Sequence, residues 1–154
     1  MAPGSFVIGE VTIEEGTGIW NGAIVRGDDD SVEIGSRATV LENCVVEAPV
    51  GSPVKIGDGV IVSHGAIVHG ATLGDEAMVG IGGIILDGAT VGEGSIIGAG
   101  AVVPPGAVIP PNTLALGIPA KPVREVRTSE VKQVAKERQR LVSKIEKYKK
   151  LYAE

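Results

Sequence analysis

Aliphatic residues recur every six positions along most of the chain, and a small residue stands four positions after most of them. Neither the 3.6-residue period of a helix nor the two-residue period of a strand explains this spacing. A parallel β-helix does, because each hexapeptide supplies a short strand and a corner, three complete a triangular coil, and successive coils stack at the ordinary strand spacing. The series predicts about five coils and has these members: Ile13, Ile19, Val25, Ile34, Val40, Val46, Ile56, Val62, Val68, Leu73, Val79, Ile85, Val91, Ile97, Val103 and Ile109.

The pattern changes beyond Gly117. Residues 118–123 are expected to form an extended exit from the last coil, and an apolar stripe at helical spacing predicts a helix from about Ser129 to Tyr152, with Thr128 as its N-cap. Residues 1–120 carry 14 acids and 3 bases, whereas residues 121–154 carry 11 bases and 5 acids. We therefore expect a β-helix over residues 1–122. Residues 123–154 should form an exit segment and a basic helix that packs on the β-helix. The alternative is that this helix contacts a membrane or nucleic acid.

Composition supports an all-β chain. Glycine numbers 23 of 154 residues, about twice its usual share, and the chain has only four aromatic residues, which suits a prism too narrow for rings and disfavours a helical bundle. A single cysteine, Cys44, fits a reducing compartment. Because neither a signal peptide nor a membrane-spanning stretch is evident, we expect a cytoplasmic protein that binds neither membranes nor nucleic acid.

The stacking rule places particular side chains together. The inward residues Val25, Val46 and Val68 belong to one face, and the residue after each points outward: Arg26, Glu47 and His69. Glu47 and His69 lie 22 positions apart, one 18-residue coil plus four loop residues, so they should be direct neighbours, with Arg26 one coil below Glu47.

The two histidines of the chain fall in the same coil but on neighbouring faces. His64 should lie beside a corner with Glu42 beneath it, too far from His69 for both to bind one ion within a subunit. Around a threefold axis, His64 of one subunit can meet Glu47 and His69 of the next, and two histidines with a glutamate make a reasonable metal site. The spacing alone fits equally well a surface column of ion pairs without metal.

Five stretches together resemble the γ-class carbonic anhydrases, which belong to the hexapeptide-repeat proteins, and the resemblance covers nearly the whole chain. It implies a left-handed β-helix, a homotrimer that acts on CO2 or bicarbonate, and one Zn²⁺ at each interface, with His64 and His69 as ligands from different subunits. Arg26 and Asp28 match a pair that this family uses across the interface. The stretches are Ile19–Asp28, Ser63–Gly70, Gly80–Gly88, Ile97–Pro105 and Gly117–Arg124.

The departures from the family pattern concern the site itself. Glu47 replaces a histidine ligand, Leu41 replaces a glutamine that helps to orient the bound water, and Glu42 replaces an aspartate. The loop Ala48–Lys55 contains no acid, so the proton-shuttle glutamate of some members has no counterpart.

We therefore expect metal ligands His64, His69 and Glu47, with Glu42, Arg26 and Asp28 as candidate catalytic residues. CO2 hydration should be weak, because the Glu47 carboxylate reduces the Lewis acidity of the metal. The ligand set also suits Fe²⁺ or another divalent metal. Two alternatives stay open, a non-catalytic scaffold trimer and a hexapeptide acyltransferase.

Overall fold

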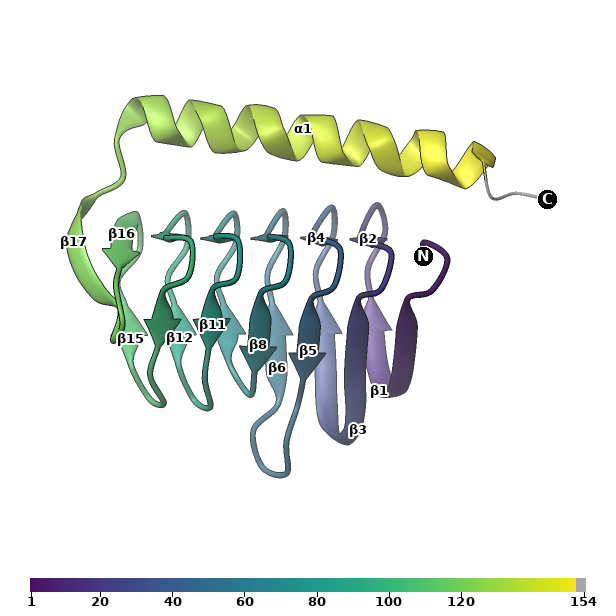
Figure 1. Cartoon of the computed structure of the whole chain (residues 1–154), viewed down its shortest axis with the longest axis horizontal. Helices are drawn as coiled ribbons and strands as arrows, with labels where there is room; N and C mark the ends of the chain where they lie inside the picture. Colours follow the sequence, from purple (N-terminus) through teal and green to yellow (C-terminus); the bar gives the residue numbers. More distant parts are fainter. Residues whose placement is uncertain (152–154) are drawn as a thin grey trace.

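The chain winds into a left-handed parallel β-helix with one long helix at its side, as the repeat and the resemblance predict (Figure 1). The computed structural model describes residues 1–151. Each triangular coil contributes a strand to each of three faces. Across these residues there are six coils rather than about five, because the segment before Ile13 adds β1 (Phe6–Ile13) to the stack.

Face 1 carries the predicted column of outward polar residues. Its strands pair in parallel from the N-terminal to the C-terminal coil, and the first two bend round the corner into face 3. In stacking order they are β1, β3 (Ile24–Ile34), β5 (Val45–Glu47), β8 (Ile67–His69), β11 (Ile84–Ile85) and β14 (Val102–Val103).

Face 2 stacks β2 (Gly18–Ile19), β4 (Thr39–Val40), β7 (Ile61–Val62), β10 (Met78–Val79), β13 (Ile96–Ile97) and β16 (Thr113–Leu116). Face 3 continues from the second halves of β1 and β3 through β6 (Val54–Ile56), β9 (Thr72–Leu73), β12 (Thr90–Val91) and β15 (Val108–Ile109).

The predicted extended exit is a strand in its own right. The strand β17 (Lys121–Glu125) runs antiparallel to β16 and pairs with it. The open edge of the last coil on face 2 is thereby covered, which protects it from pairing with another chain.

The interior of the prism is filled by the aliphatic residues of the six-residue series and by small residues at the corners. Members of the series from Ile19 to Ile109 are at most 3 % exposed, and alanines such as Ala38 and Ala66 are fully buried. Cys44 takes one of the small-residue positions, fully buried, with its Sγ 2.9 Å from the carbonyl oxygen of Ser63. Burial raises the pKa of the Cys44 thiol to about 11, so it serves packing rather than chemistry.

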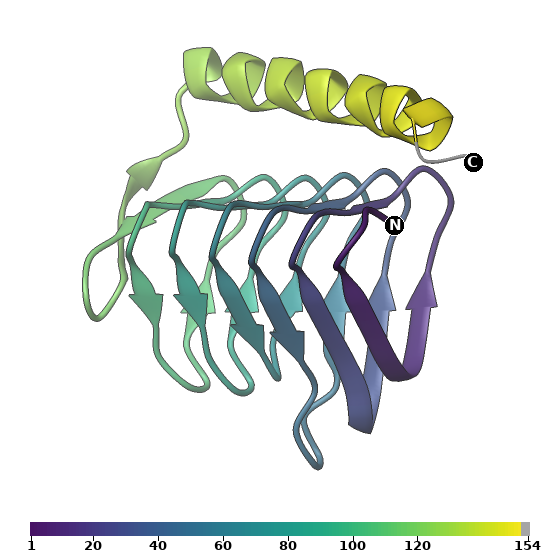
Figure 2. The same ribbon diagram turned by 45° about the vertical axis from the view of Figure 1, so that its right-hand side comes forward.

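The helix α1 (Thr128–Leu151) lies along face 2 and returns towards the N-terminal end of the prism (Figures 1 and 2). Its buried residues Leu141 and Ile145 pack on a second apolar cluster with Trp20, Leu41 and Ile61. No helix within residues 1–151 has both the length and the apolar character required to cross a membrane.

The start of α1 differs from the prediction. Thr128 is its first residue rather than its N-cap, and the preceding Arg127 accepts the first helical bonds through its carbonyl oxygen. Glu130 explains the shift, because its carboxylate accepts the backbone N–H of Arg127 at 2.8 Å and also pairs with Arg124. The predicted end at Tyr152 lies outside the described residues.

Candidate metal centre

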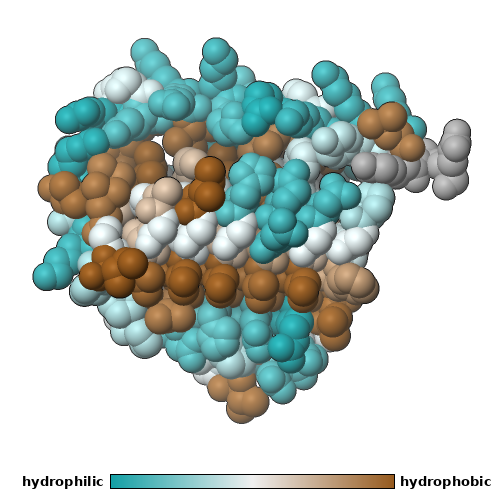
Figure 3. Space-filling view, viewed as in Figure 1, coloured by the Kyte–Doolittle hydropathy of each residue, from teal (hydrophilic) through white to brown (hydrophobic). Residues whose placement is uncertain are grey.

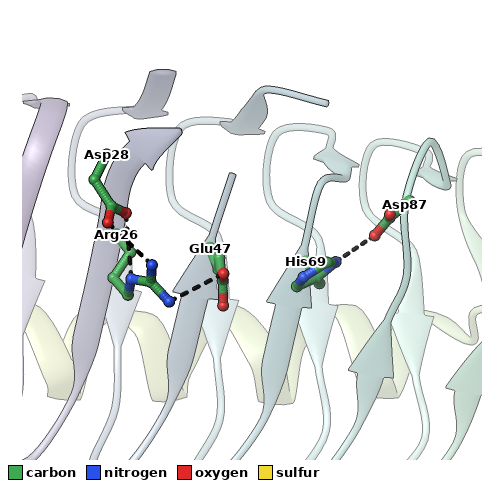
Figure 4. A network of polar contacts seen from close by, with 5 residues as sticks. All are labelled: Arg26, Asp28, Glu47, His69 and Asp87. Atoms are coloured by element: carbon green, nitrogen blue, oxygen red, sulfur yellow. Dashed lines mark hydrogen bonds and ion pairs between the residues drawn. The ribbon is translucent and has the colours of Figure 1, made fainter. Parts of the chain in front are cut away.

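The outward column of face 1 has the register that the sequence predicts. Arg26 pairs with Glu47 between β3 and β5, and Glu47 pairs with His69 between β5 and β8. Figure 4 shows the three side chains on consecutive strands. Because the inward positions of these strands are filled by buried valines, the residues next to them must point outward.

Arg26 holds two carboxylates at once. Its Nε and Nη2 donate to the two oxygens of Asp28 at 3.2 and 3.0 Å, and its Nη1 donates to Oε1 of Glu47 at 3.1 Å. The hydrogen bonds and the charge of Arg26 lower the pKa of Asp28. Arg26 therefore offsets the charge of Glu47 and holds one of its carboxylate oxygens.

His69 has a carboxylate partner in its own chain. Its Nδ1 makes a short contact with Oδ1 of Asp87, which lies at the corner after β11 (Figure 4). Directly stacked positions do not reveal Asp87, because the residue stacked on His69 is Leu86. The available signal was an acidic residue at the corner of the next coil, one position beyond Leu86.

His64 lies at the corner between faces 2 and 1, with its Nδ1 2.7 Å from Oε2 of Glu42 in the preceding coil. The predicted contact between these two residues is confirmed. The side chain of His64 is 53 % exposed and that of His69 is 33 % exposed, so both imidazoles are accessible at the surface of the single chain.

The candidate metal ligands do not come together within one chain. Among the described residues, no group of three His, Cys, Asp or Glu side chains is arranged to hold a metal ion.

An apolar row runs beside the polar column on face 1. Its members immediately precede the inward residues of their strands and point outward; Phe6 is exposed and the others are partly buried. Figure 3 shows the row as a continuous apolar band across the front of the molecule. From the N-terminal coils upward it consists of Phe6, Ile24, Val45, Ile67, Ile84 and Val102.

Leu41 has a structural role at the position where the family pattern has a glutamine. It is 4 % exposed and packs against α1 in the cluster with Leu141 and Ile145. A polar side chain there would be buried among apolar groups, at a cost in stability. Leucine in place of glutamine at position 41 therefore suits a site that α1 covers.

The donor set fits a divalent metal. A histidine ligand binds through one ring nitrogen and ordinarily donates the N–H of the other to a carboxylate or carbonyl group. Nδ1 of His69 is hydrogen-bonded to Asp87, so Nε2 is the nitrogen of this ring left to bind an ion. Nδ1 of His64 lies 2.7 Å from Oε2 of Glu42 without the geometry of a hydrogen bond, so this contact does not select the nitrogen of His64 that binds. Two imidazoles and the Glu47 carboxylate form a recognised ligand set for Zn²⁺ and Fe²⁺.

Comparison with solved structures identifies hexapeptide-repeat proteins with the same fold. A protein of Bacillus cereus described as a "putative acetyltransferase" is 38 % identical, superimposes with a TM-score of 0.92, and is matched over 97 % of this chain and 90 % of its own. A hexapeptide transferase family protein of Anaplasma phagocytophilum is 32 % identical with a TM-score of 0.84, over 92 % of this chain and 87 % of its own.

No model of a protein family matches the chain, but individual relatives do. A carbonic anhydrase of Geobacillus kaustophilus is 44 % identical over 94 % of this chain and 80 % of its own length. A protein of Methanocaldococcus jannaschii described as a "probable carbonic anhydrase" is 40 % identical over 87 % of this chain and 84 % of its own. With this identity over most of both chains, on the fold that the repeat predicts, the chain belongs to the γ-class carbonic anhydrase-like family of hexapeptide-repeat proteins.

Proposed function

We propose that the protein is a homotrimer that holds a divalent metal between subunits, with His64 from one subunit and Glu47 and His69 from the next as ligands. The observation that carries the proposal is the arrangement of the two histidines: each has Nδ1 beside a carboxylate, yet His69 lies on face 1 and His64 at the corner between faces 2 and 1. A second copy is needed to complete the site. The apolar row beside Glu47 and His69 supplies a surface on which that copy can pack.

The reaction that this site suits best is the hydration of CO2 to bicarbonate, as in the relatives named carbonic anhydrase. A bound Zn²⁺ would supply Lewis acidity, lowering the pKa of a coordinated water towards 7. Arg26, held by Asp28, positions the carboxylate of Glu47, and the carboxylate of Glu42 lies beside the His64 ring.

Hydration should nevertheless be slow. Glu47 adds a negative charge to the ligand set where a histidine would be neutral, and this charge opposes the fall in the water pKa. Arg26 offsets only part of the charge, because it is shared with Asp28 and its side chain is 36 % exposed. Leu41 is buried beneath α1 and has no polar group with which to orient a water.

The test is metal analysis of the purified assembly together with CO2 hydration rates of wild type and Glu47→His. We expect about one metal ion per chain, a low wild-type rate, and a higher rate in the variant. Glu33→His is the matched control, because Glu33 is exposed on face 3 and stacks on Lys55 away from both histidines. An assembly without metal would overturn the site, and a wild-type rate unimproved by Glu47→His would overturn the role of Glu47.

An acyltransferase is the second candidate, because the solved structure at TM-score 0.92 belongs to a protein described as a "putative acetyltransferase". Titration with acetyl-CoA, followed by calorimetry, separates the two functions. Binding of acetyl-CoA in the absence of metal would support the acyltransferase function. Stoichiometric metal without acyl-CoA binding would favour the hydration site, and a trimer with neither property would be a scaffold.

A further inference from the structure

The side chain of His69 lies between two carboxylates. Asp87 contacts its Nδ1 from the coil above, and Glu47 stacks beside it from the coil below (Figure 4). A neutral imidazole carries one proton, and its position decides which nitrogen keeps a lone pair. A carboxylate that accepts from Nδ1 leaves the lone pair on Nε2, whereas one that accepts from Nε2 would remove that nitrogen as a metal ligand.

We propose that Asp87 is a positioning residue that keeps His69 in the Nδ1–H tautomer, with the Nε2 lone pair presented to a metal. The effect on metal affinity rests on the proposed function; the effect on the tautomer does not. Carboxylate partners of this kind commonly set the orientation and basicity of a ligating histidine.

Arg26 supports this assignment from the other side of His69. The guanidinium donates to Oε1 of Glu47 at 3.1 Å and draws that carboxylate towards the lower coil. Glu47 is therefore a weaker competitor for the imidazole proton than Asp87, which has no such cationic partner among the ion pairs of the described residues apart from His69 itself. With Glu47 held by Arg26 and Asp87 free to accept from His69, the imidazole proton of His69 lies on Nδ1, towards Asp87.

The backbone places Asp87 for this contact. Val68 pairs with Ile85 on face 1, but Leu73 pairs with Val91 on face 3, so the upper coil has one more residue at this corner than the lower coil. Asp87 occupies the longer corner, where its carbonyl oxygen accepts the N–H of Gly106 at 2.8 Å. Its side chain, 48 % exposed, can turn down to His69 without burying an unpaired charge.

The experiment is long-range ¹H–¹⁵N NMR of the metal-free protein, combined with Zn²⁺ affinity measured against a competing chelator. The chain has two histidines, so the spectrum contains two imidazoles. We expect the Nδ1–H tautomer for His69 in wild type, a shift towards Nε2–H in Asp87→Ala, and a 10- to 100-fold loss of Zn²⁺ affinity, roughly the effect typical of such partners. Asp87→Asn, which keeps an acceptor oxygen, should retain part of both properties.

Asp75→Asn is the matched control. Asp75 is an exposed corner aspartate whose Oδ1 accepts the N–H of Asp58, near the junction of faces 3 and 2 and away from the column. It should leave the tautomers and the affinity unchanged. Each variant is first required to elute at the wild-type size; if Asp87→Ala does not, the comparison uses Asp87→Asn.

The outcomes separate the two proposals. A tautomer that changes in Asp87→Ala, in a protein that binds no Zn²⁺, would support the positioning role while overturning the proposed metal site. An unchanged tautomer in a folded variant would overturn the positioning role, whatever the affinity. A changed tautomer with undiminished Zn²⁺ binding would show that Asp87 does not set the affinity.

Discussion

Docking of the helix α1 onto the prism should depend on Leu141. This residue is 2 % exposed and belongs to the apolar cluster that joins α1 to Trp20, Leu41 and Ile61. Replacing a buried leucine by alanine removes its transfer free energy and leaves a cavity, which together cost about 2.7–5 kcal/mol. We expect Leu141→Ala to weaken docking by about 3 kcal/mol, which corresponds to roughly a 150-fold change in the docking equilibrium.

Trp20 provides the assay. It is the single tryptophan of the chain, 3 % exposed, with Tyr148 of α1 at 5.1 Å between ring centroids and Lys144 of α1 over its ring. Its fluorescence should therefore shift to the red when α1 leaves face 2. Urea titration should show this change at a clearly lower denaturant concentration in Leu141→Ala than in wild type.

Val131→Ala is the control on the same helix. Val131 is 48 % exposed, so its truncation should change docking by less than about 0.5 kcal/mol. If Leu141→Ala and Val131→Ala give the same midpoint as wild type, the apolar cluster does not hold the helix, and the reasoning is refuted. Far-UV circular dichroism along the same titration reports whether the helix unfolds as it leaves, as expected where tertiary packing supplies most helical stability.

Two further predictions concern the β-helix itself. A Cβ on Gly92 would lie 2.4 Å from the backbone nitrogen of Pro111, whereas a Cβ on Gly100 would meet nothing within 4 Å and would be strained only by the φ of +66°. Gly92→Ala should therefore lower the melting temperature much more than Gly100→Ala, which should cost about 1–2 kcal/mol. Equal shifts in melting temperature would contradict the close approach of the coils. The pKa of Cys44 is raised to about 11, so its thiol stays protonated in the folded state. The stabilising contribution of this shift is present below the unfolded pKa and is lost as the pH rises through 11. Alkylation by iodoacetamide at pH 8 should be slow in the native protein and rapid in urea, and equally fast labelling in both would show that Cys44 is accessible.

The column of face 1 could be predicted because its geometry follows from a strict repeat. Once Val25, Val46 and Val68 are assigned to the interior, the residues after them must point outward, and even the four-residue insertion before Ile56 only lengthens a loop. The pairing of Glu47 with His69 therefore needs nothing beyond counting.

Asp87 and Leu41 could not be found in that way. Asp87 reaches His69 diagonally, because one coil has a residue more than its neighbour at that corner, and counting stacked positions passes over such contacts. Leu41 belongs to the prism but is buried by α1, which lies about a hundred residues later in the chain. Its environment depends on where the helix docks.

By itself, the sequence determined the β-helix, the register of its coils and the outward direction of the site residues, since a six-residue period leaves one way to bury the aliphatic positions. Only the tertiary structure decided the partners of the polar groups. Arg26 divides its donors between Asp28 and Glu47, and Asp87 takes the Nδ1 of His69. Such choices depend on distances of a few ångströms between flexible side chains at corners, where the period no longer constrains the backbone.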